Sequence, residues 1–202
     1  MSTLAAQAKP VESAANGKQK RISWEEFQRE YLNREDGYKY EWLNGEVVKF
    51  KSMDYTQVFI LDNLFELFDQ LKLEKKVKGR LISEVDSFFQ KNHRRPDIAY
   101  FSPDQIARTA YGENQVPGFL VEVVSTRDQI NDLNLKMNNY RDASVEVVWQ
   151  VYPKTQEVHV FSGKGLKYSE VMKGEDLCSA APVLPDFVIS VNDIFQKPPK
   201  PE

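Results

Sequence analysis

Apolar side chains recur along this chain with two spacings, every three to four residues in some stretches and every second residue in others. The first spacing is typical of a helix with one buried face, and the second of a half-buried strand. Helices are predicted over residues 23–32, from Asp54 to about residue 71, over residues 128–142, and within the polar connection 102–117. Strands are predicted at 40–43, 46–50, 83–89, 118–124, 145–151 and 157–161, and a late apolar segment spans 184–189. This order predicts an α/β fold in which helices flank a mixed central β-sheet.

Local signals define several of these boundaries. Ser23 followed by Glu26 fits a capping box at the start of the first helix. Asn44-Gly45 separates two strand-like runs and favours a type I′ turn, so we expect a β-hairpin there. Asp54 is the predicted cap of the long second helix.

Two carboxylates interrupt segments that otherwise resemble buried strands. Asp97 follows Pro96 and precedes an apolar run, and Glu122 stands within another such run. An ionised carboxylate in an apolar setting costs several kcal/mol unless it has a partner. We therefore expect a metal ion or a basic side chain nearby, with Lys136 as the basic candidate. The alternatives are a turn residue for Asp97 and an outward-facing strand residue for Glu122.

The helix predicted over 128–142 carries Asp132, Lys136 and Tyr140 at four-residue intervals on one side. Lys136 could either reach the carboxylates or pair only with Asp132 on the helix surface, an arrangement worth about 0.2–0.5 kcal/mol. Tyr140 is interpreted as a packing residue whose hydroxyl reaches the edge of the site. His93 and His159 are assigned no catalytic role.

These residue types suit metal-dependent cleavage of phosphodiester bonds. Asp97 and Glu122 offer the oxygen ligands that Mg²⁺ or Mn²⁺ prefers, and such an ion can polarise a phosphate and lower the pKa of bound water. The ammonium group of Lys136 would orient that water or stabilise the negative transition state.

Composition limits the class of protein. The chain has 202 residues, of which 41% are hydrophobic and 28% charged, as expected for one globular domain. We expect that domain over 21–197, with a disordered tail at 1–20 and frayed residues at 198–202. The single Cys178 excludes an intramolecular disulfide, and no run is long and apolar enough for a membrane span, so a cytoplasmic protein is expected. The formal net charge of −3 gives no general attraction to nucleic acid.

Several short motifs occur in a fixed order along the chain. They are YEWLNGE at 40–46, RPDIA at 95–99, VEVVS at 121–125, then Asp132, Lys136 and Tyr140, and VEVVWQVYP at 145–153. In combination the chain resembles the PD-(D/E)XK nuclease superfamily, and within it the Uma-two family of bacterial endonucleases. The resemblance covers roughly residues 23–161 and implies a restriction-endonuclease-like core.

The resemblance also implies roles for individual residues. The superfamily lysine normally stands two residues after the strand glutamate, where this chain has Val124, and the family pattern supplies it instead from Lys136. Glu41 is implied as a further acidic site residue, although it could simply face solvent in its hairpin. The chain departs from the family pattern at residues 125–128 and at Tyr152, where an aspartate is usual.

We therefore expect a Mg²⁺- or Mn²⁺-dependent endonuclease acting on nucleic acid, with DNA as the expected substrate. Asp97 and Glu122 would bind the metal, Lys136 would position or activate water, and Glu41 would help to hold the metal or its water. A homodimer is expected by analogy with related folds that cut two strands. The alternative is a catalytically inactive binding or regulatory protein that keeps the nuclease scaffold.

Overall fold

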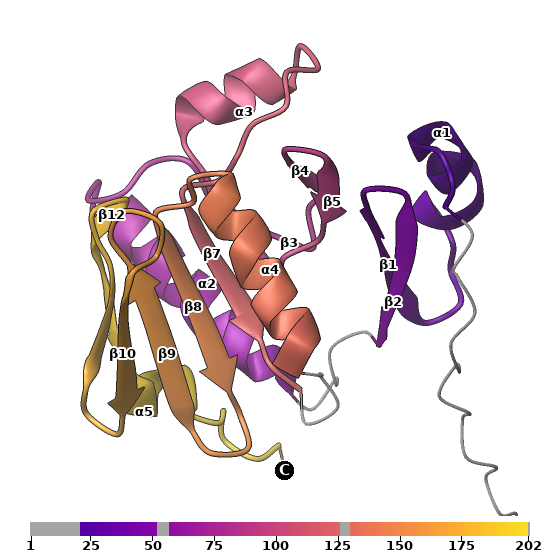
Figure 1. Cartoon of the computed structure of the whole chain (residues 1–202). Coiled ribbons are helices and arrows are strands. Elements are labelled where there is room, and N and C mark those ends of the chain that lie inside the picture. The colour runs from indigo at the N-terminus through magenta and orange to yellow at the C-terminus, as the bar shows by residue number, and fades with distance from the viewer. Residues whose placement is uncertain (1–20, 52–56, 126–129, 202) are drawn as a thin grey trace, which may run out of the picture.

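The computed structural model describes residues 21–51, 57–125 and 130–201 (Figure 1). Its helices are α1 (Trp24–Phe27), the π-helical turn η1 (Gln28–Leu32), α2 (Val58–Leu73), α3 (Pro103–Thr109), α4 (Ile130–Asp142) and α5 (Val191–Ile194). Its strands are β1 (Tyr38–Leu43), β2 (Glu46–Lys51), β3 (Arg80–Ser83), β4 (Ser87–Phe89), β5 (Asn92–Arg94), β6 (Ile98–Phe101), β7 (Phe119–Val123), β8 (Val147–Tyr152), β9 (Glu157–Ser162), β10 (Tyr168–Lys173), β11 (Leu177–Ala180) and β12 (Leu184–Ser190).

A six-stranded sheet in the order β10-β9-β8-β7-β6-β3 forms the centre of the molecule. Strands β7 and β8 are parallel, whereas the other neighbours are antiparallel. Helix α4 crosses one face of this sheet and α2 lies behind the other (Figure 1). The expected mixed α/β architecture is therefore confirmed.

Side-chain alternation along the strands explains why each face has its own core. On the α2 side, Val121 and Trp149 pack with Ile60, Leu64 and Phe68 of the helix. The intervening strand positions point the other way, because successive strand residues face opposite sides. On that side a second core contains Leu120, Val148, Met137 and Tyr140. A polar side chain at an even-numbered position of β7 or β8 therefore faces α4.

A smaller antiparallel sheet, in the order β2-β1-β5-β4, lies beside the main one. The predicted hairpin turn forms its tip, with positive φ angles of 46° at Asn44 and 98° at Gly45. Glycine adopts such a conformation at little cost. Of the predicted capping box, the hydrogen bond from the Glu26 amide to the Ser23 hydroxyl forms, at 3.1 Å. The two-residue turn at Asn44-Gly45 fixes the register of β1 on β2, which positions the side chains of β1.

Two sequence-based interpretations need correction. Residues 83–89 are not one strand, because β3 ends at Ser83 and β4 starts only at Ser87 after a turn in which Glu84 has a φ of 48°. The sequence pattern also missed β10, whose side chains are largely exposed, and the four-residue β11, in which Cys178 and Ala180 are buried but Leu177 is exposed. The predicted tail and the proposed cap at Asp54 lie outside the described residues.

Candidate active site

A row of polar side chains crosses the face of the main sheet that α4 covers. Asp97 immediately precedes β6, and the register of β6 on β7 places it beside Glu122. Glu122 pairs with Gln150 of β8, and Gln150 pairs with His159 of β9. Asp97, Glu122 and Gln150 are buried, with relative exposures of 7%, 4% and 5%. The two predicted carboxylates are thus neighbours on adjacent strands.

Helix α4 supplies the partners of Glu122. The Lys136 ammonium donates to Glu122 Oε2 at 2.9 Å, and the Tyr140 hydroxyl donates to Oε1. The four-residue spacing of Lys136 and Tyr140 places both on one side of the helix, above the strand. The prediction that Lys136 reaches the strand glutamate is confirmed by this geometry, and its ammonium is not restricted to a surface pair with Asp132. Tyr140 contacts the carboxylate directly as well as packing in the core.

Asp97 is held from two sides. Its Oδ2 accepts from the backbone amide of Val123 at 2.7 Å, and its Oδ1 accepts from the Lys39 ammonium at 3.0 Å. Lys39 comes from β1 and is buried, and its ammonium also lies 4.0 Å from the half-exposed Glu84 carboxylate. Sequence reasoning did not single out Lys39. The available signal was its two-residue spacing from Glu41, which places both side chains on the same side of the hairpin strand.

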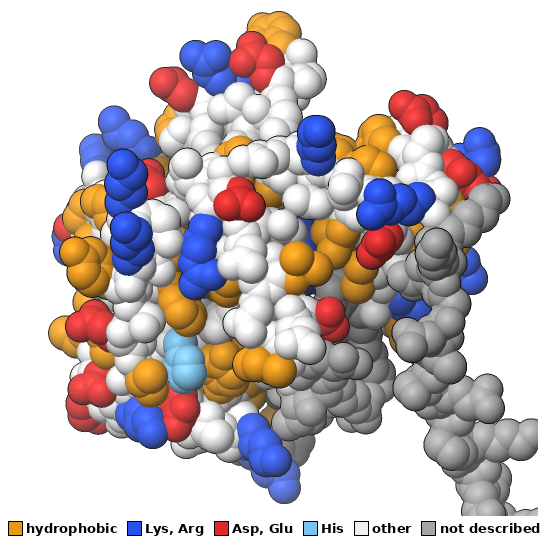
Figure 2. Space-filling model, viewed as in Figure 1, with side chains coloured by type: hydrophobic (Ala, Val, Ile, Leu, Met, Phe, Trp, Pro, Cys, Tyr) orange, Lys and Arg blue, Asp and Glu red, His pale blue; other side chains and the backbone are white. Residues whose placement is uncertain are grey.

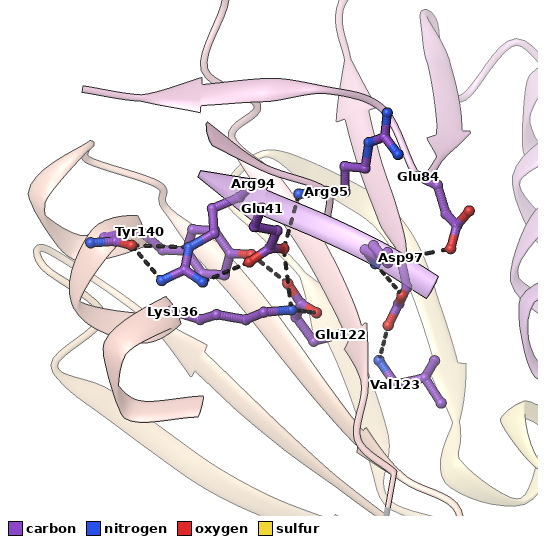
Figure 3. A network of polar contacts seen from close by, with 11 residues as sticks. Glu41, Glu84, Arg94, Arg95, Asp97, Glu122, Val123, Lys136 and Tyr140 are labelled. Carbon is purple, nitrogen blue, oxygen red and sulfur yellow. Dashed lines mark hydrogen bonds and ion pairs between the residues drawn. The ribbon is translucent and has the colours of Figure 1, made fainter. Parts of the chain in front are cut away.

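Glu41 joins the small sheet to α4 (Figure 3). Its Oε2 accepts from Arg94 Nη1 at 2.7 Å, and its Oε1 accepts from the Arg95 amide at 3.1 Å and lies 3.7 Å from Lys136 Nζ. Arg94 in turn donates to Asn139 Oδ1 of α4 at 2.6 and 3.0 Å. Glu41 has no exposed surface, so the alternative that it faces solvent is wrong.

Within the described residues, the network is balanced in charge. Asp97, Glu122 and Glu41 are matched by Lys39, Lys136 and Arg94; we call these six residues the buried ion network. Such matching is needed because an uncompensated buried charge costs several kcal/mol.

Burial and neighbouring charges shift the pKa values within this network. Burial opposes ionisation of Glu41, but the surrounding Lys136, Arg94 and Lys39 outweigh it and lower its pKa to about 2. For Glu122, burial together with the nearby Asp97 raises the pKa despite the attraction of Lys136. Burial alone would lower the pKa of Lys136, yet Glu122 and Glu41 raise it overall, so the lysine is a stable cation. The surroundings of Glu122 accordingly disfavour its negative charge.

The carboxylate oxygens of Asp97 and Glu122 are of the type that binds a hard divalent cation, but they already accept hydrogen bonds from Lys39 and Lys136. Carboxylate oxygens from Asp97 and Glu122 suit Mg²⁺, which commonly keeps several waters beside one or two carboxylates. Within residues 21–51, 57–125 and 130–201, no three or more Asp, Glu, His or Cys side chains gather closely enough to form a metal cage. An ion bound by Asp97 and Glu122 would have to share their oxygens with the donors that already contact them, among them Lys39 and Lys136.

Comparison with known proteins identifies the family of this chain and a solved structure with a similar fold. A family model for Uma2, described as putative restriction endonuclease, matches residues 24–192. The chain belongs to the Uma2 family. Among curated proteins, none matches the sequence. A crystal structure described as a putative nuclease belonging to DUF820, from Anabaena variabilis, superimposes with a TM-score of 0.71 at 18% identity. The match covers 86% of this chain and 97% of that one, and it shows a shared fold.

Membership of the Uma2 family accounts for the order of the motifs along the chain. The buried ion network includes all four expected site residues, which come from β1, the segment before β6, β7 and α4.

In the part of the chain that the structure describes, no helix has the length and apolar character needed to cross a membrane.

Proposed function

We propose that this protein is a metal-dependent endonuclease that hydrolyses phosphodiester bonds in nucleic acid, with DNA as the expected substrate. The observation that carries the proposal is the pair of adjacent buried carboxylates, Asp97 and Glu122, with the Lys136 ammonium 2.9 Å from Glu122. A divalent ion held by the carboxylates would polarise the phosphate and acidify a bound water. Lys136 would orient that water or stabilise negative charge on the phosphate.

The remaining residues position these groups. Tyr140 and the Val123 amide each occupy one carboxylate oxygen and fix the orientation of Glu122 and Asp97. After Glu122, Glu41 is the next acid that raises the pKa of Lys136, and it joins this lysine to Arg94, so we assign Glu41 a positioning role. A cytoplasmic location and a homodimer that cuts both strands belong to the same proposal, the dimer by analogy with related nuclease folds.

A nuclease-fold protein that binds without cutting is the second candidate. The charge balance of the buried ion network favours it, because the acids are already compensated by lysine and arginine. The face seen in Figure 2 also intersperses acidic, basic and hydrophobic side chains, with no dominant basic area among its described residues. Such a surface offers little general attraction to a polyanion.

Incubation of the purified protein with plasmid DNA and structured RNA, with Mg²⁺ or Mn²⁺ and with chelator, separates the two candidates. We expect metal-dependent nicking by the wild type and its loss in Asp97→Asn. Asp86→Asn is the matched control, because Asp86 is also ion-paired, to His93 and Arg95, but lies outside the buried ion network. Absence of cutting on every substrate and metal tried, or equal cutting by Asp97→Asn, would reject the nuclease proposal.

A further inference from the structure

A cavity of about 270 Å³ lies where β7 and β8 end. Val124, Ile130 and Leu133 give it apolar walls, and Tyr152 and Lys154 line it from the β8 side. Because β7 and β8 are parallel, their carboxyl ends meet at the same edge of the sheet. Ligands of α/β proteins commonly bind at this edge.

Strands β7 and β8 connect the cavity to the carboxylate site. Val124 follows Glu122 by two residues, which corresponds to about 7 Å along an extended strand and to the same side of the sheet. The Val124 amide donates to the Val151 carbonyl at 2.8 Å, so the pairing of the strands continues to the cavity. On β8, the Tyr152 hydroxyl donates to the side-chain oxygen of Gln150 at 2.8 Å. Gln150 is the register partner of Glu122.

The lining chemistry favours one kind of occupant. Apolar and aromatic walls suit the flat face of a nucleobase. Stacking on an aromatic side chain is favourable for any of the bases, because each has a π-face. Lys154 lies at the exposed rim and suits a phosphate group. An apolar peptide side chain would use the walls but would leave the lysine and the adjoining carboxylate site without a counterpart. A phosphodiester chain with one base turned inward uses all three features.

We propose that this cavity binds an unpaired nucleobase of the substrate strand next to the scissile phosphate, with Tyr152 as the aromatic contact and Lys154 beside a neighbouring phosphate. The proposal rests on the proposed nuclease function and names its substrate class as nucleic acid with at least one unpaired nucleotide. A base within a duplex is stacked on both faces, so it would have to leave the helix to enter such a cavity.

Measurement of Kd in Ca²⁺ tests this proposal with three kinds of fluorescent probe that share one sequence. They are a single strand, its full duplex, and a series of single strands in which one abasic nucleotide is placed at each position in turn. We expect the wild type to bind the intact single strand about tenfold more tightly than the duplex and than one abasic strand. Tyr152→Leu should remove both preferences while retaining residual phosphate-driven binding. Tyr168→Leu is the matched control, since Tyr168 is an exposed strand tyrosine outside the cavity.

Two results would overturn the cavity assignment: equal affinity of the wild type for intact strand, duplex and every abasic strand, or preferences that persist in a folded Tyr152→Leu protein. If Tyr152→Leu does not fold, Lys154→Ala provides a second test, because Lys154 is exposed and its replacement should not disturb folding. Lys154→Ala should weaken the binding of intact and abasic strands alike by a few-fold. Cleavage of the same probes in Mn²⁺ separates this inference from the proposed function. Cutting without a base preference rejects only the cavity, whereas a base preference without cutting rejects only the nuclease.

Discussion

Lys39 and Lys136 both bury an ammonium group beside a carboxylate, but they approach from different elements. Lys39 extends from β1 to Asp97 at 3.0 Å, and Lys136 extends from α4 to Glu122 at 2.9 Å. Burial and the nearby Lys136 both oppose the charged state of Lys39, but Asp97, Glu122 and Glu41 outweigh them and raise its pKa. Lys136 is proposed to act on water or phosphate, whereas Lys39 only holds Asp97, so substitution can separate their roles.

Replacing Lys39 by Met should destabilise the metal-free protein by about 3–5 kcal/mol, because Asp97 is left as a buried charge without its cationic partner. A divalent cation should then recover more stability in this variant than in the wild type, since it can take the vacated place beside Asp97. Urea titrations in chelator and in Mn²⁺ measure both effects. Lys49→Met, an exposed lysine of the same hairpin, is the control, and equal losses in the two variants would contradict the role of Lys39.

Lys136→Ala should reduce kcat on any substrate that the wild type cuts by about 10²-fold or more, as expected for removal of a group that stabilises developing charge. Metal binding, followed by the Mn²⁺-dependent rise in Tm, should persist because both carboxylates remain. Asp132→Ala on the same helix should leave kcat unchanged. Near-normal turnover by a folded Lys136→Ala protein would remove Lys136 from the mechanism.

The lowered pKa of Glu41 predicts a defined pH dependence of stability. Its folded pKa of about 2 lies below the usual 4.5, so its contribution is fully present above about pH 4.5 and is lost as pH falls toward 2. Over that window the stability of the wild type relative to Glu41→Gln should fall by about 1.4 kcal/mol per pH unit, to a total of about 3 kcal/mol. Denaturant titrations of both proteins from pH 5 to 3 measure the slope. A pH-independent difference would show that Glu41 is not held ionised by its partners.

At the scale of elements, the turn from α2 into β3 restricts which residue can stand at position 79. Gly79 has a φ of +81°, and a Cβ there would lie 2.2 Å from the Phe101 carbonyl oxygen. Gly112 has a similar φ of +78° but open space around it. Gly79→Ala should therefore cost several kcal/mol and Gly112→Ala only about 1 kcal/mol. Thermal unfolding compares the two, and similar Tm losses would contradict the close approach of β3 and β6.

Periodicity was sufficient to predict the strands and helices that bury one face. Helix α4 and strands β7, β8 and β9 lie within a few residues of the predicted spans, because their apolar positions report burial directly. The exposed β10 lacks that signal. Asp97, Glu122 and Lys136 could be found because charges within apolar runs, or a family motif, mark them.

The pairing of Lys39 with Asp97 could not be predicted in the same way. The two residues are 58 positions apart in the chain, and their contact depends on how the small sheet packs against the main one. Arg94 stands only three residues before Asp97 in the chain, yet its guanidinium binds Glu41. Local spacing determines the face on which a side chain lies, but tertiary packing decides what it meets there.

At the scale of the whole molecule, the buried ion network lies where the two sheets and α4 meet. Lys39 joins β1 to the start of β6, Arg94 joins β5 to α4, and Lys136 joins α4 to β7. The same contacts that would perform chemistry therefore also hold the small sheet against the main one. Substitutions in this network should be judged by stability and activity together.

The balanced charge of that network also couples the two ligands thermodynamically. A divalent cation adds two positive charges to a compartment that is already neutral, whereas a phosphodiester adds negative charge beside it. Each ligand should therefore be bound more tightly when the other is present, and reciprocity requires the same factor in both directions. Titration of Ca²⁺ with and without oligonucleotide, and of oligonucleotide with and without Ca²⁺, should give matching gains of at least about fivefold. Independent binding would mean that metal and nucleic acid do not bind at this network together. Matching gains would mean that the reactive state, with both ligands bound, is populated mainly when metal and nucleic acid are present at the same time.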